Sequence, residues 1–599
     1  MEFKGIQEEY QKRYQESKTK FDHYSRLGKQ FSLYRILVFI ITVIGVYFGT
    51  RHGMDYVLAV FIPGLIVFLL LVKYHSSVHR KKKISQTLMQ INEKELDVLD
   101  MKFTKYDGGS DLNEVDHPYT HDLDVFGKGS LFQYINRCVS FAGRKVLSDY
   151  LKFPEYSRKK IIDRQKAVKE IAPKIDWRQN FQLHGLMAEE KKEDLKRLKE
   201  WLHVESYFDR PIFWIFVYVI PAFMLASVLA VILNLWAVQA LLIPIFISLS
   251  ASGSFYKRIN YIHFLLDQQT GLLKKYQSVF ESIEKTEFEA PYLKQLQQQL
   301  KTADSSAVKE CSKLYGIAKK FEFRNNIIVA ILLNILFLWD IRQCVLMEKW
   351  RRRNKKYFEK WLDTLSEFDA LNSLATLTYN RSDLHFPTVS DHQLCYQAKN
   401  AGHLLINPQK REDNPISFNS WKEFQIITGA NMAGKSTYLR TVGSNLILAM
   451  AGAPVCAEEL TFAPVQIFTS IKTVDSLLEN ESYFFAELKR LKEIIVRLEK
   501  GEQLFIILDE ILKGTNSKDK QTGSMALVEQ LIRLGASGII ATHDLVLGSL
   551  ATRFPENVKN YCFEVEFQED HLIFDYQLKK GISQNLNATF LMKQMGITL

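Results

Sequence analysis

A glycine-rich segment, Gly429-Ala430-Asn431-Met432-Ala433-Gly434-Lys435-Ser436-Thr437, has the residue types and spacing that suit binding of phosphate groups. It matches the eight-position phosphate-loop pattern and lies between the apolar run 424–428 and a stretch expected to be helical, 438–449. Backbone amides of such a loop point at phosphate oxygens beside a helix N-terminus, whose dipole favours anions. Lys435 is expected to reach the β- and γ-phosphates, and Ser436 to hold Mg²⁺ through its hydroxyl. The segment therefore predicts a site for ATP and Mg²⁺.

Two adjacent acids, Asp509 and Glu510, end the apolar run 504–508. If that run is a buried strand, Asp509 can support Mg²⁺ and Glu510 can activate the attacking water. His543 ends a similar run and is predicted to sense or stabilise the γ-phosphate; the alternatives are solvated acids and a structural histidine. Catalysis at such a site is mostly positioning and charge neutralisation. Glu510 and His543 are thus the predicted catalytic residues, and Ser436 and Asp509 the predicted metal ligands.

Four short apolar runs, 424–429, 467–474, 504–510 and 537–543, alternate with stretches of helical composition near the end of the chain. Runs of this kind, buried on both faces and separated by helices, are typical of a mainly parallel sheet covered by helices. We therefore predict a C-terminal α/β domain of the P-loop, ABC-type ATPase class over residues 386–599.

Two pairs of apolar runs predict helical hairpins that cross a membrane. In the first hairpin, residues 31–73, the runs 36–49 and 56–72 flank a short polar turn. In the second, residues 211–256, no Asp, Glu, Lys or Arg occurs. A helix needs about 20 apolar residues to span a bilayer core, and the arms approach that length. The alternative is two pairs of buried core helices.

Basic residues flank both hairpins. Lys73 and the run 80–83 follow the first, and Arg210, Lys257 and Arg258 bracket the second. The positive-inside rule puts these flanks in the cytoplasm. Four crossings would keep the nucleotide site there too, so we expect a multi-pass protein of the cell (inner) membrane. The polar first 30 residues do not resemble a cleaved signal peptide.

The remaining segments are predicted to be mostly helical. They are a polar N-terminal segment, 1–30, a connector, 74–115, and two parts of a helical core, 116–210 and 257–385. The run 327–339 is apolar but has only 13 residues, too few to cross a bilayer as a helix. We interpret it as a buried part of a long helix, with a fifth crossing as the alternative.

Composition sets broad limits on the protein class. A chain of 599 residues is long enough for several domains with buried cores. Its six cysteines are scattered without the spacing of disulfide frameworks or zinc sites, which fits a reducing compartment. A net charge of +11 is compatible with nucleic acid, anionic lipid or neither.

Several segments resemble the MutS family. The stretch 427–443 is similar to its phosphate loop, 508–527 to its Walker B strand and following loop, and 541–544 to its histidine switch. The segment 481–487 resembles the signature that completes the partner subunit's ATP site. The resemblance implies that Asn431 contacts nucleotide, that Ser482 acts in trans, and that the protein forms a homodimer. The phosphate loop departs from the family pattern at Ala430 and Ala433, and the segment after the Walker B acids departs from it at Leu512 and Lys513.

The resemblance extends to the helical region, where 129–154 and 365–379 are similar to the family's core and lever segments. It implies an α-helical MutS core joined to the ATPase domain. A membrane hairpin and a connector stand where the family's mismatch readers have N-terminal recognition domains. The second hairpin falls inside the helical core region, so the usual DNA-clamp insertion is not recognisable. We therefore expect ATP-driven dimer switching, without mismatch reading of the familiar kind.

Two functional hypotheses remain open. The first is a membrane-anchored ATPase that binds DNA structures, supported by a basic cluster whose positive charges can neutralise phosphates. This cluster consists of Lys349, Arg351, Arg352, Arg353, Lys355 and Lys356. A solvated helix face or contact with anionic headgroups explains it equally well. The second hypothesis is an ATP-driven membrane module that does not bind DNA, although its hairpins lack the intramembrane charges of a transport pathway.

Overall fold

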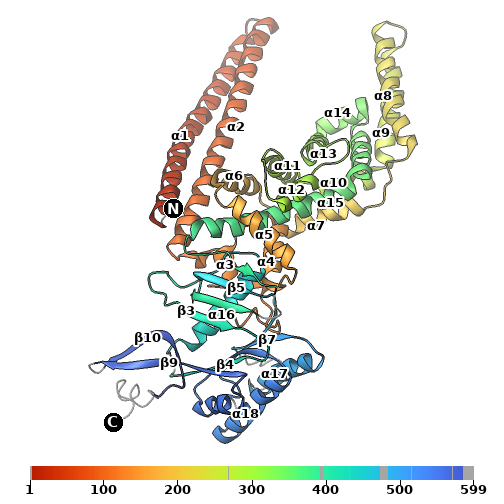
Figure 1. Ribbon diagram of the computed structural model, residues 1–599. Helices are drawn as coiled ribbons and strands as arrows, with labels where there is room; N and C mark the ends of the chain where they lie inside the picture. Colours follow the sequence, from red (N-terminus) through yellow and green to blue (C-terminus); the bar gives the residue numbers. More distant parts are fainter. Residues whose placement is uncertain are drawn as a thin grey trace.

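Figure 1 shows the computed structural model, which describes residues 3–267, 269–391, 395–430, 432–472, 483–513, 516–568 and 571–584. A helical body occupies the middle of the molecule. Two helical hairpins project from it in the same general direction, and an α/β domain lies at the opposite end. The apolar hairpins and the predicted nucleotide site are thus at opposite ends of the chain's fold.

The first hairpin consists of α1 (Phe3–Gly49) and α2 (Met54–Leu99). The turn between them ends at Gly53, whose φ of 110° favours glycine. Each helix combines a polar half and an apolar half without a break, with the polar half first in α1 and the apolar half first in α2. Residues 3–30 of the expected N-terminal segment and much of the connector 74–115 therefore belong to the hairpin. At 1.5 Å per residue, each helix is about 70 Å long. In each helix, an apolar window of 18 residues has no buried residue.

The second hairpin consists of α8 (Pro211–Ile232), the short helix η3 (Val238–Leu241) and α9 (Leu242–Ser254). The chain then bends by 60° into α10 (Tyr256–Leu266). Within the described ranges, α1, α2 and α8 are each long and apolar enough to cross a membrane. The number rises to five if each of two bent helix pairs counts as one span. By length and composition, the four predicted crossings lie within this range.

The run 327–339 differs from its prediction as a buried part of a long helix. It forms a separate helix, α14 (Ile327–Phe337), and Leu338 adopts a left-handed φ of 46° before a 77° bend into α15 (Trp339–Asn380). Two asparagines set these ends: Asn326 caps α14, and the Asn334 amide oxygen accepts from the backbone N–H of Asp340 at 3.0 Å.

The apolar face of α14 is exposed, with Ile327 at 73% and Leu332 at 55%, so the prediction of burial is wrong. Only Asn334 of α14 is classed as buried. The segments flanking α14 meet, because Phe323 stacks on Trp339 with ring centroids 6.2 Å apart. Because the two ends of this segment lie together, the structure favours a short excursion of the chain at α14 over a fifth crossing of the membrane.

The helical body is organised around α15, which packs on helices from both halves of the region. Its other helices are α3 (Leu131–Ile135), α4 (Phe141–Lys152), α5 (Arg158–Ile171), α6 (Ile175–Leu186), α7 (Lys192–His203), α11 (Thr270–Glu284), α12 (Pro291–Gln299) and α13 (Ala307–Phe321). The largest hydrophobic core runs without interruption from this body into one face of the C-terminal sheet. The two parts of the chain therefore share a core.

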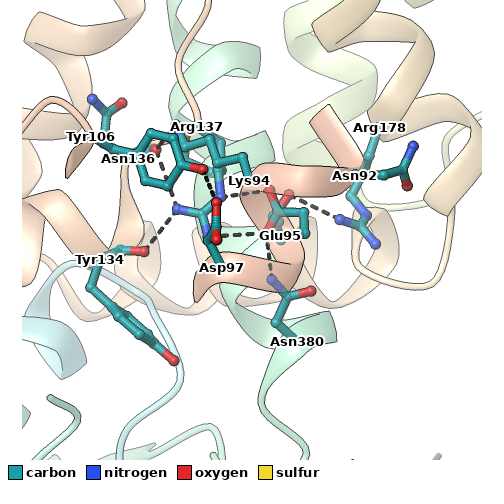
Figure 2. A network of polar contacts seen from close by, with 12 residues as sticks. Asn92, Lys94, Glu95, Asp97, Tyr106, Tyr134, Asn136, Arg137, Arg178 and Asn380 are labelled. Atoms are coloured by element: carbon teal, nitrogen blue, oxygen red, sulfur yellow. Dashed lines mark hydrogen bonds and ion pairs between the residues drawn. The ribbon is translucent and has the colours of Figure 1, made fainter. Parts of the chain in front are cut away.

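A buried polar network fastens the first hairpin to this body (Figure 2). The Glu95 carboxylate of α2 accepts two hydrogen bonds from the Arg137 guanidinium, at 2.7 and 3.0 Å. The same carboxylate accepts from the side-chain amide of Asn380, at the end of α15, at 2.6 Å. Tyr10 of α1 donates to the Asn380 oxygen at 2.8 Å. Both hairpin helices are thereby tied to the end of α15.

The described residues of the C-terminal domain form two sheets. The larger has the order β10-β9-β4-β8-β7-β6, and all its neighbouring strands are parallel except the β10–β9 pair. Its strands are β4 (Phe424–Gly429), β6 (Gln466–Ser470), β7 (Leu504–Asp509), β8 (Ser537–Thr542), β9 (Val558–Gln568) and β10 (His571–Lys580). A smaller sheet, ordered β1-β5-β2-β3, contains β1 (Thr388–Val389), β2 (Tyr396–Ala401), β3 (Asn414–Phe418) and β5 (Glu459–Phe462). The predicted parallel α/β architecture is confirmed.

Helices cover both faces of the larger sheet. Alternate residues of its central strands point to opposite faces. One set joins α16 (Lys435–Met450) and the core of the helical body, and the other packs with α17 (Tyr483–Glu499) and α18 (Ser517–Arg533). A short helix, α19 (Leu550–Arg553), precedes β9. Burial on both faces explains why the strands have uninterrupted apolar sequences.

Candidate functional site

Three segments predicted to carry the chemistry follow three adjacent strands. The glycine-rich loop follows β4, the two acids end β7, and His543 follows β8, which lies between those strands. Because these strands are parallel, their carboxyl ends meet at one edge of the sheet. Ligands of open α/β sheets bind at this edge. The topology therefore brings together residues that are more than a hundred positions apart.

The glycine-rich loop turns tightly into α16. Gly429 has a φ of 154°, and a Cβ atom there would lie 2.6 Å from the carbonyl oxygen of Phe563, so only glycine fits. Gly434 has a φ of 105° and immediately precedes Lys435, the first residue of α16. The Lys435 ammonium donates to the carbonyl oxygens of Gly429 and Ala430 at 2.7 and 2.8 Å. Burial lowers the pKa of Lys435, while the charges of Glu510 and Asp509 oppose that shift.

Ser436 and Asp509 form a pair suited to a divalent cation. The Ser436 hydroxyl donates to Asp509 Oδ2 at 2.5 Å, which joins the start of α16 to the end of β7. The other carboxylate oxygen, Oδ1, is buried and has no hydrogen-bond partner among the described residues. Burial raises the pKa of Asp509, against the effect of the Ser436 hydrogen bond. A hydroxyl beside a carboxylate with an unpaired oxygen fits Mg²⁺, which prefers oxygen ligands.

Glu510 lies at the centre of a group of basic side chains. Its backbone has a left-handed φ of 47°, and its N–H donates to the carbonyl oxygen of Ala541 at 2.9 Å. The carboxylate is 3.7 Å from Nδ1 of His543 and 3.5 Å from the Lys513 ammonium. His543 Nε2 is in turn 3.3 Å from the Lys520 ammonium. Glu510 and His543 therefore lie beside each other at this edge of the sheet.

A cavity of about 360 Å³ opens beside the loop. Its walls include Gly434, Lys435, Ser436 and Thr437 of the loop and helix start, and Glu510. Sequence reasoning missed the opposite wall, which comes from the segment 406–414 and from β9 and β10. That wall includes Ile406, Lys410, Arg411, Glu412, Phe563 and Tyr576. No local motif marks these residues, because long-range strand pairing brings them to the loop.

A second missed residue is Glu487 of α17, which supports the segment after the two acids. Its buried carboxylate accepts from the backbone N–H groups of Leu512 and Lys513, at 2.6 and 3.3 Å. Burial raises the pKa of Glu487, while these two hydrogen bonds oppose the shift. Leu512 has a left-handed φ of 58°, so its turn needs such support. Glu487, the last residue of the segment 481–487, thus links α17 to the segment that follows Glu510.

The other predicted loop residues have different environments. Met432 is 80% exposed with a left-handed φ of 66°, and it lines the cavity. Ala433 is buried, and Thr437 lies in the first turn of α16 on the cavity wall. Asn431 and Ser482, whose roles were inferred from resemblance, lie outside the described residues.

Comparison with known proteins gives two domain matches. Residues 425–592 match the model of MutS domain V, which is an ABC-type ATPase domain. Residues 114–375 match the model of MutS domain III, and this range includes the α8–α9 hairpin. The α1–α2 hairpin precedes both matched ranges. The two matches coincide with the nucleotide site and the helical body.

Individual relatives cover parts of the chain. A DNA mismatch repair protein MutS of Thermotoga maritima is 29% identical over 249 residues, 41% of this chain and 31% of the relative. A MutS protein homolog 4 of Homo sapiens is 33% identical over 239 residues, 38% and 25% of the two chains. A DNA mismatch repair protein MutS of Streptococcus pyogenes is 28% identical over 295 residues, 48% and 34% of the two chains. The chain thus spans between a quarter and about a third of the length of these relatives.

Proposed function

We propose that this chain, a member of the MutS family through its domains III and V, is a membrane-anchored ATPase that hydrolyses ATP with Mg²⁺. The main support is the convergence of the loop lysine, the Ser436–Asp509 pair and the Glu510–His543 pair at one sheet edge. Each of these groups has a distinct task in phosphoryl transfer.

The loop amides and the Lys435 ammonium bind the phosphates, and Thr437 and Met432 complete the wall around them. Ser436 and Asp509 hold Mg²⁺, which when bound neutralises charge on the phosphate oxygens. Glu510 accepts a proton from the attacking water, and His543 orients the Glu510 carboxylate and stabilises the γ-phosphate. Asn431 contacts the nucleotide, and Ser482 reaches the ATP site of a second copy, so the active form is a homodimer.

The membrane anchor is supported by the exposed surfaces of both hairpins. A soluble monomer rarely exposes large contiguous apolar patches, yet an apolar window of 18 residues in each of α1 and α2 has no buried residue. Polar contacts fix the base of the second hairpin: Arg324 pairs with Asp340 at 3.3 Å and donates to the Asn260 oxygen at 2.7 Å. Charged residues at the base and apolar residues beyond it are typical of helices that enter a bilayer.

We expect the full-length protein to remain in the membrane fraction after washing at alkaline pH, because apolar spans are held by the hydrocarbon core and not by surface charge. The measurement is the distribution of the chain between pellet and supernatant. A peripheral membrane protein in the same preparation serves as the control, since alkaline washing removes it. Recovery of the chain with that control protein would contradict the anchor.

We further propose that the protein acts on DNA, because its relatives include DNA mismatch repair proteins, and that it binds DNA structures rather than mismatches. The basic cluster supports DNA binding less strongly than the sequence suggested. Arg351 is buried and donates to the Trp201 carbonyl, while Arg352 and Arg353 pair with Asp209 and Asp304. Lys349 lies over the ring of Trp214. Much of the cluster therefore contacts acidic, aromatic or backbone groups of the same chain and does not form a free phosphate-binding face.

Gel-shift measurements on the detergent-solubilised protein test the DNA role. We expect binding to four-way and homoduplex DNA that weakens steeply with salt, since phosphate contacts release counterions, and no preference for a mismatch. Mismatched duplex of the same length is the matched control. A preference for that duplex would contradict our expectation about mismatches.

Absence of salt-sensitive binding to any of these DNAs would instead favour a second candidate function. In that function, closure of the ATPase dimer moves the helical body and the hairpins without DNA. The internal pairing of the basic cluster, close to the base of α8, is the observation that favours it.

A further inference from the structure

A cavity of about 230 Å³ lies between the two helices of the first hairpin. On α1 its walls include Ser25, Gly28 and Lys29, and on α2 they include His75, His79 and Lys82. The spacing of three, four or seven positions on each helix means that these residues share the facing sides of α1 and α2. The cavity is therefore part of the seam between the two helices.

Small residues open this part of the seam. Nearer the tip of the hairpin the helices approach closely: a Cβ at Gly45 would lie 2.8 Å from Val60, and one at Gly64 would lie 2.3 Å from Thr42. At Gly28 an added Cβ would meet only Val78, at 4.0 Å. Side chains of the facing helix thus fill the space beside the glycines near the tip, whereas the space beside Gly28 can hold another group.

Charge in and around this space is strongly positive. The cavity wall carries two lysines and two histidines, and no Asp or Glu is among its lining residues. The Nδ1 atom of His75 is buried and has no hydrogen-bond partner among the described residues. The adjoining stretches 18–35 and 73–83 contain one acid, Asp22. Their basic residues are Lys18, Lys20, Arg26, Lys29, Arg35, Lys73, Arg80, Lys81, Lys82 and Lys83. Such a site attracts an anion.

The cavity also lies at a defined level of the hairpin. The apolar run of α1 begins at Ile36 and that of α2 ends at Val72, so His75 is within one helical turn of the apolar surface. Aromatic rings occur at the same level, where Phe31 stacks on the exposed Tyr74 with ring centroids 6.4 Å apart. Aromatic and basic residues at the end of an apolar run mark the headgroup region of a bilayer.

We propose that this cavity binds the phosphate of an anionic phospholipid headgroup. Ammonium and imidazole groups donate charge-assisted hydrogen bonds to phosphate oxygens, and Lys29, Lys82 and His75 offer such donors from both helices. A seam between two packed helices admits a headgroup from the side, whereas a nucleic acid backbone needs an open face. The proposal rests on the membrane anchor proposed above, since the lipid reaches the cavity from the bilayer.

The test uses the full-length protein in phosphatidylcholine nanodiscs that contain a minor fraction of phosphatidylglycerol. The protein is then extracted in mild detergent, and the retained lipids are measured by mass spectrometry. We expect enrichment of phosphatidylglycerol over its bulk fraction. The double variant Lys29→Gln/Lys82→Gln should lower that enrichment roughly tenfold, because two charge-assisted contacts are lost.

Two further variants separate a site from general attraction. Lys18→Gln/Lys20→Gln removes the same charge from exposed positions of α1 that do not line the cavity, and it should keep the enrichment. Gly28→Leu fills the space without changing charge, and it should abolish the enrichment. An equal loss in both lysine variants, or unchanged enrichment in Gly28→Leu, would overturn the proposal.

The source of the phosphate is tested by competition. Enrichment that persists with inorganic phosphate or a duplex oligonucleotide in the buffer supports a lipid ligand, whereas displacement by either overturns it. The experiments distinguish failure of the proposed membrane anchor from failure of the proposed headgroup site. A protein that an alkaline wash removes from phosphatidylcholine vesicles has no anchor, whereas a retained protein with no preference for phosphatidylglycerol has no headgroup site.

Discussion

Replacement of Glu510 by Gln is expected to leave ATP binding intact and to lower the rate of hydrolysis by about a hundredfold or more, the range for loss of a positioned general base. The Gln side chain keeps the size of Glu510 but cannot accept the proton of the attacking water. Binding should persist because Lys435, Ser436 and the loop amides are unchanged. The measurements are steady-state phosphate release and the affinity for a fluorescent ATP analogue, both with Mg²⁺ and the full-length protein.

The matched control for this prediction is Glu556→Gln. Glu556 is exposed and lies just before β9, at the opposite edge of the sheet from the nucleotide site, so the charge change is the same without contact with the site. This variant should hydrolyse ATP at the parent rate. If Glu510→Gln also kept the parent rate, Glu510 would not be the base, and another acid would have to activate the water.

The loss of ATP binding in Glu510→Gln would have a different meaning. Glu510 lies near the basic groups Lys513 and His543. A defect in binding would show that this carboxylate organises the charge of the site before it takes part in chemistry. The comparison of affinity with turnover thus separates a catalytic role from a positioning role.

The sequence predicted the local parts of this site and missed the long-range ones. The loop at Gly429 and the acids at Asp509 and Glu510 are contiguous motifs next to apolar strands, so their place follows from the chain itself. Glu487, Arg411 and Tyr576 reach the site through helix and strand packing, and no spacing rule identifies them. Glu487 ends the segment 481–487 that resembles the family signature, but that resemblance assigned it no contact with the segment after Glu510.

The prediction for α14 was wrong because it rested on helix length and hydropathy alone, whereas capping residues determine where this helix begins and ends. Asn326 and Asn334 lie within or beside the apolar run, and each satisfies backbone N–H groups where the chain changes direction. Because the chain changes direction at both ends, α14 is a separate short helix and not part of one long helix. The basic cluster illustrates the same limit, since the acids that pair with Arg352 and Arg353 are distant in sequence.

Glu95→Gln is expected to cause the largest loss of stability of any single substitution considered. Glu95 and Arg137 have side chains 2% and 3% exposed, and removing one partner of a buried pair costs about 3–5 kcal/mol. The neutral Gln leaves the guanidinium buried without a counter-charge, and it also weakens the contact with Asn380 that joins α2 to α15. The hairpin should therefore open locally from the helical body.

Amide hydrogen exchange at residues 91–99 measures this opening. A cost of that size corresponds to exchange faster by roughly a hundredfold to several thousandfold. Glu281→Gln is the control, because it breaks the exposed Glu281–Lys285 pair of α11, and exposed pairs contribute about 0–1 kcal/mol. The double variant Glu95→Gln/Arg137→Met should recover part of the loss, since no unpaired charge then remains buried. Equal exchange in the two single variants would contradict the role assigned to the buried pair.

The same pair predicts how the stability of the hairpin's attachment depends on pH. Burial alone would raise the pKa of Glu95, but the charge and hydrogen bonds of Arg137 outweigh it and hold the pKa below its usual value of 4.5. The folded protein therefore takes up this proton less readily than the unfolded chain does. The contribution of Glu95 is complete above pH 4.5 and is lost as the pH falls from there through the folded pKa. Glu95→Gln should lack this pH-dependent contribution, so the difference in exchange rate between variant and parent should shrink on acidification. A difference that stays constant with pH would mean that the charge of Glu95 does not hold the hairpin to the helical body.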